Sequence, residues 1–202
     1  MTPEVAILDY GSGNLYSLKC ALERQKAKVR IGKLLPSPEK LDGLVLPGVG
    51  SFDAGAASIA RNRESINSLR ERGVPLLGIC LGLQLFFPKS EEGTSKGAGF
   101  FNGSVKRLGG PLKVPHMGWN TLRITSESPL LEGVSDGEWV YFVHSYYPVP
   151  RDRGIITAEA DYGVTFPAAV SAGNIFGTQF HPEKSGVTGA KILERYVELC
   201  RR

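Results

Sequence analysis

A cysteine between two glycines is the first feature of this sequence that could do chemistry. Cys80 follows an apolar run at residues 75–79, and Gly78 and Gly82 lie two positions to either side of it. Glycines there allow a sharp turn and the close approach of another backbone. Strand-to-helix turns of this kind lift a nucleophile above the sheet in α/β folds. A helix that begins after Cys80 directs free N–H groups and its positive end at the sulfur, which favours the thiolate.

A histidine and a carboxylate near the other end of the chain could serve this cysteine. His181 follows an apolar run at 175–180, and Glu183 lies two residues later, beyond a proline that makes the turn rigid. A carboxylate beside an imidazole fixes its tautomer and stabilises its cation, and a thiol nucleophile needs such an oriented base. The alternative is that Cys80 is only a small buried core residue. Because nucleophile, base and orienting group are all present, we predict a catalytic triad of Cys80, His181 and Glu183.

The elements that must position these residues follow from the apolar pattern. Continuous apolar runs at 5–8, 43–47 and 75–79 are typical of buried parallel strands. We expect a further strand at 28–32, and helices at 15–26, at 53–72, directly after Cys80 and at 189–200. The second half is strand-like, with a hairpin at 100–108 marked by Asn-Gly, and strands at 120–125, 138–144, 154–160, 166–171 and 175–180. The sequence therefore predicts one α/β domain with a mixed, mostly parallel central sheet flanked by helices, and an antiparallel extension.

The loops that leave the parallel strands are expected to form the site, because ligands of open α/β sheets bind beyond the carboxyl ends of the strands. Val49, Cys80 and His181 all lie in such loops. Gly48 and Gly50 permit an unusual or switchable backbone around Val49, with peptide N–H groups free to face a ligand. The alternative is an ordinary loop before a helix. Since this loop should face the Cys80 turn, we predict that Val49 contributes to an oxyanion hole.

Composition limits the remaining possibilities. A chain of 202 residues with 42% hydrophobic and 22% charged residues is typical of one globular domain with a sizeable core. The net charge of +4 comes from basic residues interspersed with acidic ones, so we expect no nucleic-acid binding. Three distant cysteines have neither a disulfide framework nor metal-ligand spacing, which favours a reducing cytoplasm. We expect no cofactor. Cys200 falls on an apolar helix face, where we expect it to pack.

Two further features concern the first part of the chain. The first nine residues lack a basic region followed by a long apolar core, so we expect no signal peptide, and no apolar run is long enough for a membrane span. The turn from Gly11 to Asn14 lacks the third glycine of a dinucleotide fingerprint. We interpret it as a turn near the site or on a partner surface.

The segments at 78–84 and 181–183 resemble the class I (triad-type) glutamine amidotransferases, and this resemblance covers essentially the whole chain. Segments at 47–52, 113–120, 141–147 and 179–185 resemble one branch of that class, the glutaminase subunits of imidazole glycerol phosphate synthases. The resemblance implies a flavodoxin-like fold and a single glutaminase domain over residues 1–202. It also implies the hydrolysis of glutamine to glutamate and ammonia through a γ-glutamyl thioester.

The resemblance assigns roles to particular residues. Cys80 would be the nucleophile, His181 the general base and then acid, and Glu183 the group that orients it. The oxyanion would be held by the backbone N–H of Leu81 and, after a peptide rearrangement, by that of Val49. Contacts with glutamine are expected from Gly50, Gln84, Glu92, Ser145 and Tyr146, with Glu92 suited by charge to the α-ammonium group.

The same branch implies a partner. Ammonia would pass through a channel to a (β/α)₈-barrel cyclase subunit in a heterodimer, which makes imidazole glycerol phosphate and aminoimidazole carboxamide ribotide in histidine biosynthesis. Trp119, Tyr141, Lys184 and the turn at Gly11 and Asn14 would face this partner. The alternatives are a core position for Trp119 and an exposed lysine without a role for Lys184. Rival functions are an amidotransferase of another pathway, a stand-alone cysteine hydrolase and a non-catalytic interaction module.

Overall fold

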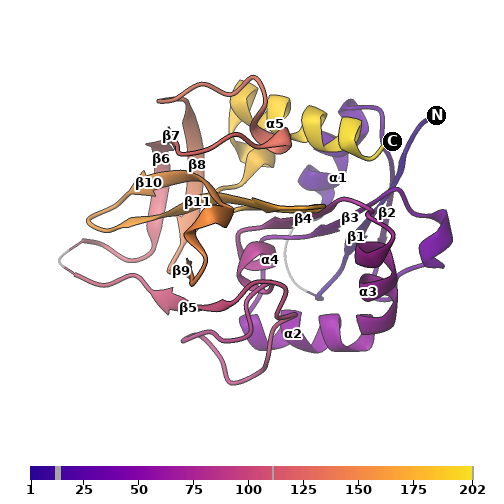
Figure 1. Ribbon diagram of the computed structural model, residues 1–202, viewed down its shortest axis with the longest axis horizontal. Coiled ribbons are helices and arrows are strands. Elements are labelled where there is room, and N and C mark those ends of the chain that lie inside the picture. The colour runs from indigo at the N-terminus through magenta and orange to yellow at the C-terminus, as the bar shows by residue number, and fades with distance from the viewer. Residues whose placement is uncertain (12–14, 111, 202) are drawn as a thin grey trace.

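The computed structural model describes residues 1–11, 15–110 and 112–201, and an eight-stranded sheet forms its middle layer (Figure 1). The strand order is β2-β1-β3-β4-β12-β11-β10-β7. The neighbours from β2 to β12 pair in parallel, and those from β12 to β7 pair antiparallel. The bounds are β1 (Glu4–Leu8), β2 (Lys28–Gly32), β3 (Gly43–Leu46), β4 (Leu76–Ile79), β7 (Arg123–Ile124), β10 (Ile156–Asp161), β11 (Thr165–Ala172) and β12 (Ile175–Thr178). The predicted fold class, with a parallel half and an antiparallel extension, is confirmed.

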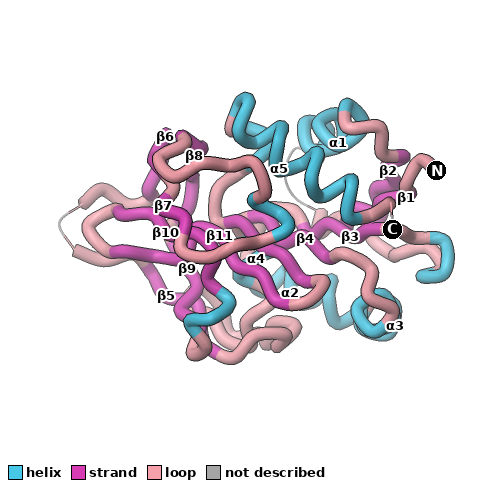
Figure 2. The backbone as a smooth tube through the Cα atoms, turned by 45° about the horizontal axis from the view of Figure 1, so that its top comes forward, coloured by secondary structure: helices cyan, strands magenta, loops and turns pink. Residues whose placement is uncertain are grey.

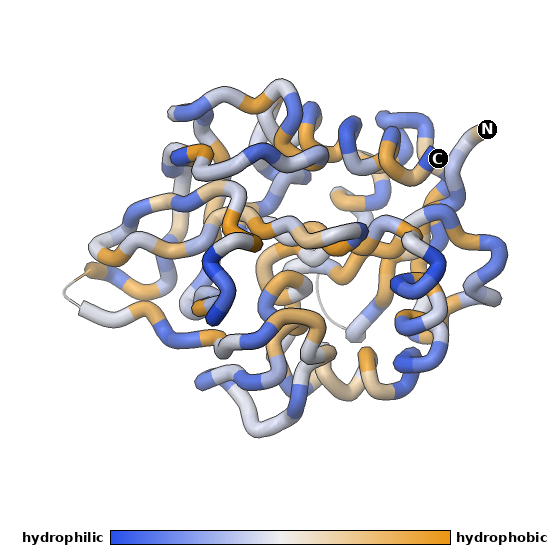
Figure 3. Tube along the Cα trace, viewed as in Figure 1, coloured by the Kyte–Doolittle hydropathy of each residue, from blue (hydrophilic) through white to orange (hydrophobic). Residues whose placement is uncertain are grey.

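Helices cover both faces of the sheet, as Figures 1 and 2 show. One face packs against α1 (Leu15–Arg24) and α5 (Gly186–Leu199), and the other against α2 (Phe52–Arg61), α3 (Arg63–Glu71) and α4 (Leu81–Gln84). Strands β3, β4 and β12 are therefore buried along their whole length, which explains their continuous apolar sequence. Hydrophobic residues accordingly gather along the middle layer in Figure 3. Short 3₁₀ turns are η1 (Pro38–Lys40), η2 (Pro129–Leu131), η3 (Arg153–Ile155) and η4 (Pro182–Lys184).

Two small sheets extend the fold beyond the antiparallel half. Strand β5 (Gly103–Arg107) pairs with β9 (Tyr146–Pro150), and β6 (His116–Thr121) pairs with β8 (Trp139–His144). The hairpin expected at 100–108 is wrong, because Gly103 begins a strand that pairs with a distant segment. A Cβ at Gly103 would lie 2.3 Å from the Val149 carbonyl oxygen. Glycine is therefore needed here because the two strands approach closely, and not because the chain turns. Strand β9 escaped prediction because it contains two prolines, which argue against a strand.

The helix expected at 53–72 is broken at Asn62 into α2 and α3. The Asn62 side chain is buried and donates to the carbonyl oxygens of Ser58, at 2.9 Å, and Lys33, at 3.0 Å. Its oxygen accepts from the Leu35 backbone N–H at 2.9 Å. The side chain at the break therefore holds the loop after β2 in place through its bonds to Lys33 and Leu35. Across the described residues, none of the helices has both the length and the apolar character needed to cross a bilayer.

We predict that Asn62→Ala lowers the free energy of unfolding by about 1–3 kcal/mol, because the Lys33 carbonyl oxygen and the half-buried Leu35 N–H lose their side-chain partner. Urea denaturation followed by circular dichroism measures this change. Asn67→Ala, at a half-buried position of α3, is the matched control and should change the value by less than about 0.5 kcal/mol. Equal effects of the two substitutions would contradict the role given to Asn62.

Candidate active site

Cys80 occupies a strained turn between β4 and α4. Its backbone has φ 46° and ψ −99°, a conformation that costs a non-glycine residue about 1–3 kcal/mol. The backbone N–H of Cys80 donates to the Thr178 carbonyl oxygen at 2.7 Å, which ties the turn to the end of β12. The predicted sharp strand-to-helix turn is confirmed, and it places the thiol at the carboxyl ends of the parallel strands.

The two neighbouring glycines are required by close contacts. A Cβ at Gly82 would lie 2.0 Å from the Leu46 carbonyl oxygen, and one at Gly78 would lie 2.6 Å from the Leu83 nitrogen. Both atoms belong to backbone and cannot move aside. Only hydrogen fits at these positions, so the start of α4 lies directly over the ends of β3 and β4.

Helix α4 is shorter than the apolar pattern indicated. It ends at Gln84, because a later segment folds back and its backbone N–H groups bond to the carbonyl oxygens that follow the helix. The backbone N–H of Ala98 donates to Leu85 at 2.7 Å, and that of Phe101 donates to Phe86 at 3.2 Å. A helix of one turn has a small dipole, so the free N–H groups of its first residues are what it offers beside the sulfur.

His181 and Glu183 form the buried pair that their spacing predicted. The Nδ1 atom of His181 lies 2.8 Å from Oε1 of Glu183. The backbone holds this imidazole in place, because the His181 N–H donates to the Tyr141 carbonyl oxygen at 2.9 Å and Ser185 Oγ donates to the His181 carbonyl oxygen at 2.6 Å. The other ring nitrogen, Nε2, is buried without a hydrogen-bond partner among the described residues. It is thus the nitrogen available for proton transfer.

Gly48 brings the cysteine and the histidine together. A Cβ at Gly48 would lie 2.6 Å from His181 Cε1 and 3.2 Å from Cys80 Cβ, so both side chains crowd the same glycine. Burial by itself would lower the pKa of His181, but the interactions of the imidazolium with Cys80 and Glu183 outweigh it and raise this pKa to about 10. An imidazolium beside a cysteine favours the thiolate. The arrangement suits nucleophilic catalysis.

The residues expected to hold an oxyanion flank the cysteine turn. Leu81 is the first residue of α4, and Val49 follows Gly48 in the loop after β3. A cavity of about 130 Å³ lies next to this loop. Its lining comes from the start of α1, the loop after β3 and η4, and includes Val49, His181, Glu183 and Lys184.

Three of the expected glutamine contacts lie around the sulfur. The Cys80 thiol donates to the Val143 carbonyl oxygen at 3.7 Å, so the end of β8 and the following Ser145 and Tyr146 are close to it. Gln84 is buried, and its side-chain nitrogen donates to the Tyr146 carbonyl oxygen at 2.8 Å. The structure therefore joins Gln84 to Tyr146, directly after Ser145 and close to Cys80.

The other two expected contacts, Glu92 and Gly50, both lie near the start of α2. Glu92 is exposed as a residue, but its carboxylate leans on the helix start and accepts from the Phe52 backbone N–H. Partial burial, with a smaller effect of the Asp53 charge, raises the pKa of Glu92. Asp53 also anchors the loop that carries Glu92, because its Oδ1 accepts from the Ser95 N–H at 2.9 Å.

Of the expected partner residues, Gly11, Trp119 and Lys184 are exposed and Tyr141 is half-buried. Trp119 is 52% exposed, which excludes the core alternative, and its ring meets that of Tyr141 edge-on at 5.9 Å. Lys184 is exposed in η4, one residue from Glu183. Gly11 is exposed with φ 88°, and its N–H donates to Asp9 Oδ1 at 2.7 Å. Asn14 lies outside the described residues.

The sequence reasoning did not single out three buried polar side chains beside the site: Gln179, His116 and His144. Gln179 Nε2 donates to Cys80 Sγ at 3.4 Å. His144 Nδ1 donates to the Tyr146 carbonyl oxygen at 2.9 Å, and His116 Nδ1 donates to His144 Nε2 at 3.1 Å. Burial lowers the pKa of His116 to about 4 and that of His144 to about 3. A polar residue in an apolar strand pattern is the signal that could have found them.

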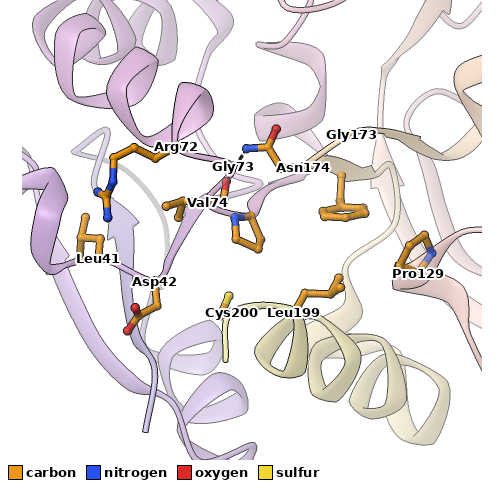
Figure 4. Close-up of a pocket in the computed structure, with 12 residues that line it drawn as sticks. Leu41, Asp42, Arg72, Gly73, Val74, Pro129, Gly173, Asn174, Leu199 and Cys200 are labelled. Carbon is orange, nitrogen blue, oxygen red and sulfur yellow. Dashed lines mark hydrogen bonds between the residues drawn. The ribbon is translucent and has the colours of Figure 1, made fainter. Parts of the chain in front are cut away.

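A second cavity, of about 420 Å³, lies at the amino ends of the parallel strands (Figure 4). The polar side chain of Asn174 in its lining is already used in a hydrogen bond of the fold, because Asn174 Nδ2 donates to the Val74 carbonyl oxygen at 2.7 Å. Burial raises the pKa of the Cys200 thiol there to about 12, so this thiol stays protonated and packs, as predicted. Within the described ranges, no cluster of three or more histidine, cysteine or acidic side chains could hold a metal ion.

We predict that Gly82→Ala lowers the free energy of unfolding by about 1–3 kcal/mol, the usual cost of overpacking. The added methyl group would meet the Leu46 carbonyl oxygen, so the Cys80 turn must shift as well. Urea denaturation measures the loss. Gly109→Ala, where a Cβ meets nothing within 4 Å, is the control and should be close to neutral.

We predict that stability falls as the pH drops from 6.5 to 5. His116 and His144 have lowered pKa values in the folded protein, so the unfolded chain binds more protons in this range and is favoured. Each histidine contributes a slope of up to about 1.4 kcal/mol per pH unit. His181, with a raised pKa, stabilises the fold below pH 6.5, and this contribution is lost only as the pH rises toward 10.

Urea midpoints at pH 6.5, 5.7 and 5.0 test this prediction above the range in which most carboxylates titrate. Replacement of both His116 and His144 by glutamine should flatten the profile between these pH values. An equally steep profile in that double variant would refute the assignment.

Comparisons with known proteins agree with the geometry. The sequence model of the class-I glutamine amidotransferases matches residues 6–199. The imidazole glycerol phosphate synthase subunit HisH of Halobacterium salinarum is 48% identical over 97% of this chain and 93% of its own length. The HisH subunit of Geobacillus kaustophilus is 49% identical over 97% of both chains.

A solved structure supports the fold. That of PurLQS from Thermotoga maritima has a TM-score of 0.74 and 20% identity, over 100% of this chain and 98% of the other. With the family match over nearly its full length, this chain belongs to the class-I glutamine amidotransferases.

Proposed function

We propose that this chain is the glutaminase subunit of an imidazole glycerol phosphate synthase, and that residues 1–202 form its single glutaminase domain. The observation that carries the proposal is the buried His181–Glu183 pair beside Cys80 in its strained turn. The identity of nearly one half to proteins named as subunits of that synthase supports the choice of pathway. Glutamine and water are converted to glutamate and ammonia.

The triad divides this hydrolysis into two steps. In the first, Cys80 Sγ attacks the side-chain carbonyl carbon of glutamine, a C–S bond forms, and the C–N bond breaks as His181 passes a proton to the leaving nitrogen. In the second, His181 takes a proton from water, the resulting hydroxide attacks the thioester, and the C–S bond breaks to release glutamate. Glu183 fixes the imidazole tautomer throughout.

The oxyanion formed in each step needs donors beside the sulfur. The Leu81 backbone N–H, at the start of α4, is one such donor, and the Val49 N–H is the other after a rearrangement of the loop between Gly48 and Gly50. A single donor of this kind typically contributes about 10²–10³ in rate. The crowding of Gly48 against both His181 and Cys80 supports this placement of the loop.

Glutamine binds between the loops that meet at the site. Glu92 takes the α-ammonium group, since its carboxylate lies close to the like charge of Asp53 and gains from a counter-charge. Gly50, Gln84, Ser145 and Tyr146 complete the contacts. The position of Gln84 against the Tyr146 carbonyl supports this assignment.

An exposed apolar face is the surface for the cyclase subunit. Met117, Trp119 and Trp139 project from β6 and β8 with 62%, 52% and 56% of their surface exposed, and Val187 lies at the start of α5 with 76% exposed. A Cβ at Gly186 would lie 3.8 Å from the Trp119 ring, so the two parts are continuous. Exposed aromatic residues of this kind are common anchors of protein interfaces. We assign this face, with Tyr141, Lys184 and the turn at Gly11 and Asn14, to a (β/α)₈-barrel partner in a heterodimer.

Ammonia leaves toward the same face. His181, Glu183 and Lys184 are among the residues that line the cavity of about 130 Å³ beside the loop after β3. A channel that starts there leads from the triad to the proposed interface. The cyclase then uses the ammonia to make imidazole glycerol phosphate and aminoimidazole carboxamide ribotide in histidine biosynthesis.

Two alternatives use the same triad. A stand-alone cysteine hydrolase would act without a partner, and an amidotransferase of another pathway would respond to a different synthase subunit. The likeness to the solved structure does not separate these, because at 20% identity it concerns the fold alone.

We predict that the purified chain releases glutamate from glutamine rapidly only when the cyclase partner and its ribulosyl ligand are both present. Cys80→Ala should reduce this rate by at least about 10³-fold, since no nucleophile remains. Glutamate release is measured for the chain alone and for the full mixture. Equal activity alone would point to an independent hydrolase, and no activity in any mixture would contradict the proposal.

We predict that Trp119→Ala weakens binding of the cyclase partner about thirtyfold, the effect of removing a central aromatic anchor worth about 2 kcal/mol. Isothermal titration calorimetry measures the dissociation constant. Glu71→Ala is the control, because Glu71 is exposed at the end of α3, shortly before the amino end of β4 and away from the loops at the carboxyl ends of the strands. Equal weakening by both substitutions would argue against the proposed face.

A further inference from the structure

We propose that Gln179 acts directly on the nucleophile: its side-chain amide donates a hydrogen bond to Cys80 Sγ and stabilises the thiolate. This inference rests on the proposed function, since it adds a donor to the glutaminase triad. The Gln179 nitrogen lies 3.4 Å from the sulfur, and the residue has no exposed surface.

The backbone holds Gln179 in position. It directly follows β12, and its N–H donates to the Ala168 carbonyl oxygen of β11 at 2.8 Å. It lies two residues before His181 on the same segment. The strand end that delivers the base therefore also delivers this donor to the sulfur.

The direction of the Gln179 amide is fixed by a chain of hydrogen bonds. The Tyr146 carbonyl oxygen can only accept, and it accepts from His144 Nδ1 at 2.9 Å and from Gln84 Nε2 at 2.8 Å. Gln84 Nε2 also donates to Gln179 Oε1 at 3.3 Å. The remaining group of Gln179 is its NH₂, which must face Cys80. A rotated Gln179 amide would place two donors against each other in a buried site.

Gln179 favours the thiolate over the thiol. The S–H group has an acceptor in the Val143 carbonyl oxygen at 3.7 Å, and this contact is lost when the proton leaves. The Gln179 N–H contact then becomes charge-assisted, and such bonds are roughly twice as strong as neutral ones. The gain is therefore confined to the ionised sulfur.

The mechanism needs this donor when the thioester is hydrolysed. As the C–S bond breaks, the sulfur leaves as a thiolate, and His181 holds the proton taken from water. An amide N–H does not titrate, so Gln179 stabilises the leaving sulfur whatever the protonation state of His181. It acts at the nucleophile and not on the bound glutamine.

The test is the rate at which iodoacetamide alkylates Cys80 in the free chain from pH 5 to pH 9, with the modified residue located by peptide mass spectrometry. Gln179→Met keeps similar volume but removes the donor, and it should slow alkylation at pH 7 about tenfold, the effect of one charge-assisted hydrogen bond. The difference should shrink toward pH 9. Gln25→Met, directly after α1 and outside the site, is the control and should leave the profile unchanged.

Gln179→Glu provides a second variant that keeps the shape and the contact with Gln84. Its carboxylate opposes the thiolate, so alkylation at pH 7 should fall further than in Gln179→Met. An unchanged rate in both variants, or a slowing that is equal at every pH, would overturn the proposal, because loss of packing alone has no pH signature.

Steady-state glutaminase kinetics with the cyclase partner separate this role from substrate binding. Gln179→Met should lower kcat about tenfold and change KM for glutamine by less than about twofold. A raised KM with unchanged kcat would overturn the proposal. The alkylation assay needs neither partner nor glutamine, so failure of the proposed function and failure of this inference are distinguishable.

Discussion

The close contact between Gly82 and the Leu46 carbonyl oxygen is the constraint on which the site depends. It sets the start of α4 against the ends of β3 and β4, and Cys80, in the turn between β4 and α4, has a backbone conformation with positive φ. That strain is tolerated because the Cys80 N–H is held by the end of β12. Cys80 is thus fixed by three parallel strands at once, and the same three strands carry the loop at Gly48 and the histidine at position 181.

Around this turn the buried polar atoms form a directional network. On one side of the Tyr146 carbonyl, hydrogen bonds join Asn120 to His116, His116 to His144, and His144 to the carbonyl oxygen. On the other side, they join the carbonyl oxygen to Gln84, Gln84 to Gln179, and Gln179 to Cys80. Burial keeps both histidines neutral near pH 7, because it lowers their pKa values. Each can then donate from one ring nitrogen and accept at the other. Positions of β6, β8 and β9 are therefore coupled to the orientation of groups at the sulfur by hydrogen bonds that have only one consistent direction.

Much of this arrangement could be predicted from local sequence. The apolar runs of β1, β3 and β4, the glycines around Cys80, and the spacing of His181 and Glu183 all carry their signal within a few residues. The rest depends on distant partners. Gly103 belongs to a strand because Val149 lies against it, the long helix breaks because Asn62 serves a loop near Leu35, and Gln179 matters because Gln84 turns its amide. No local pattern contains such partners.

The exposed face and His181 are joined through the backbone of β8. The His181 N–H donates to the Tyr141 carbonyl oxygen at 2.9 Å, and the Tyr141 N–H donates to Ser185 Oγ at 3.0 Å, which in turn donates to the His181 carbonyl oxygen. Tyr141 also packs its ring against Trp119 on the apolar face. A protein that binds this face therefore presses on the strand that holds the imidazole. Because the bond from the His181 N–H to the Tyr141 carbonyl oxygen joins main chain to main chain, a shift of β8 reaches His181 directly, and the Ser185 hydroxyl adds a second link.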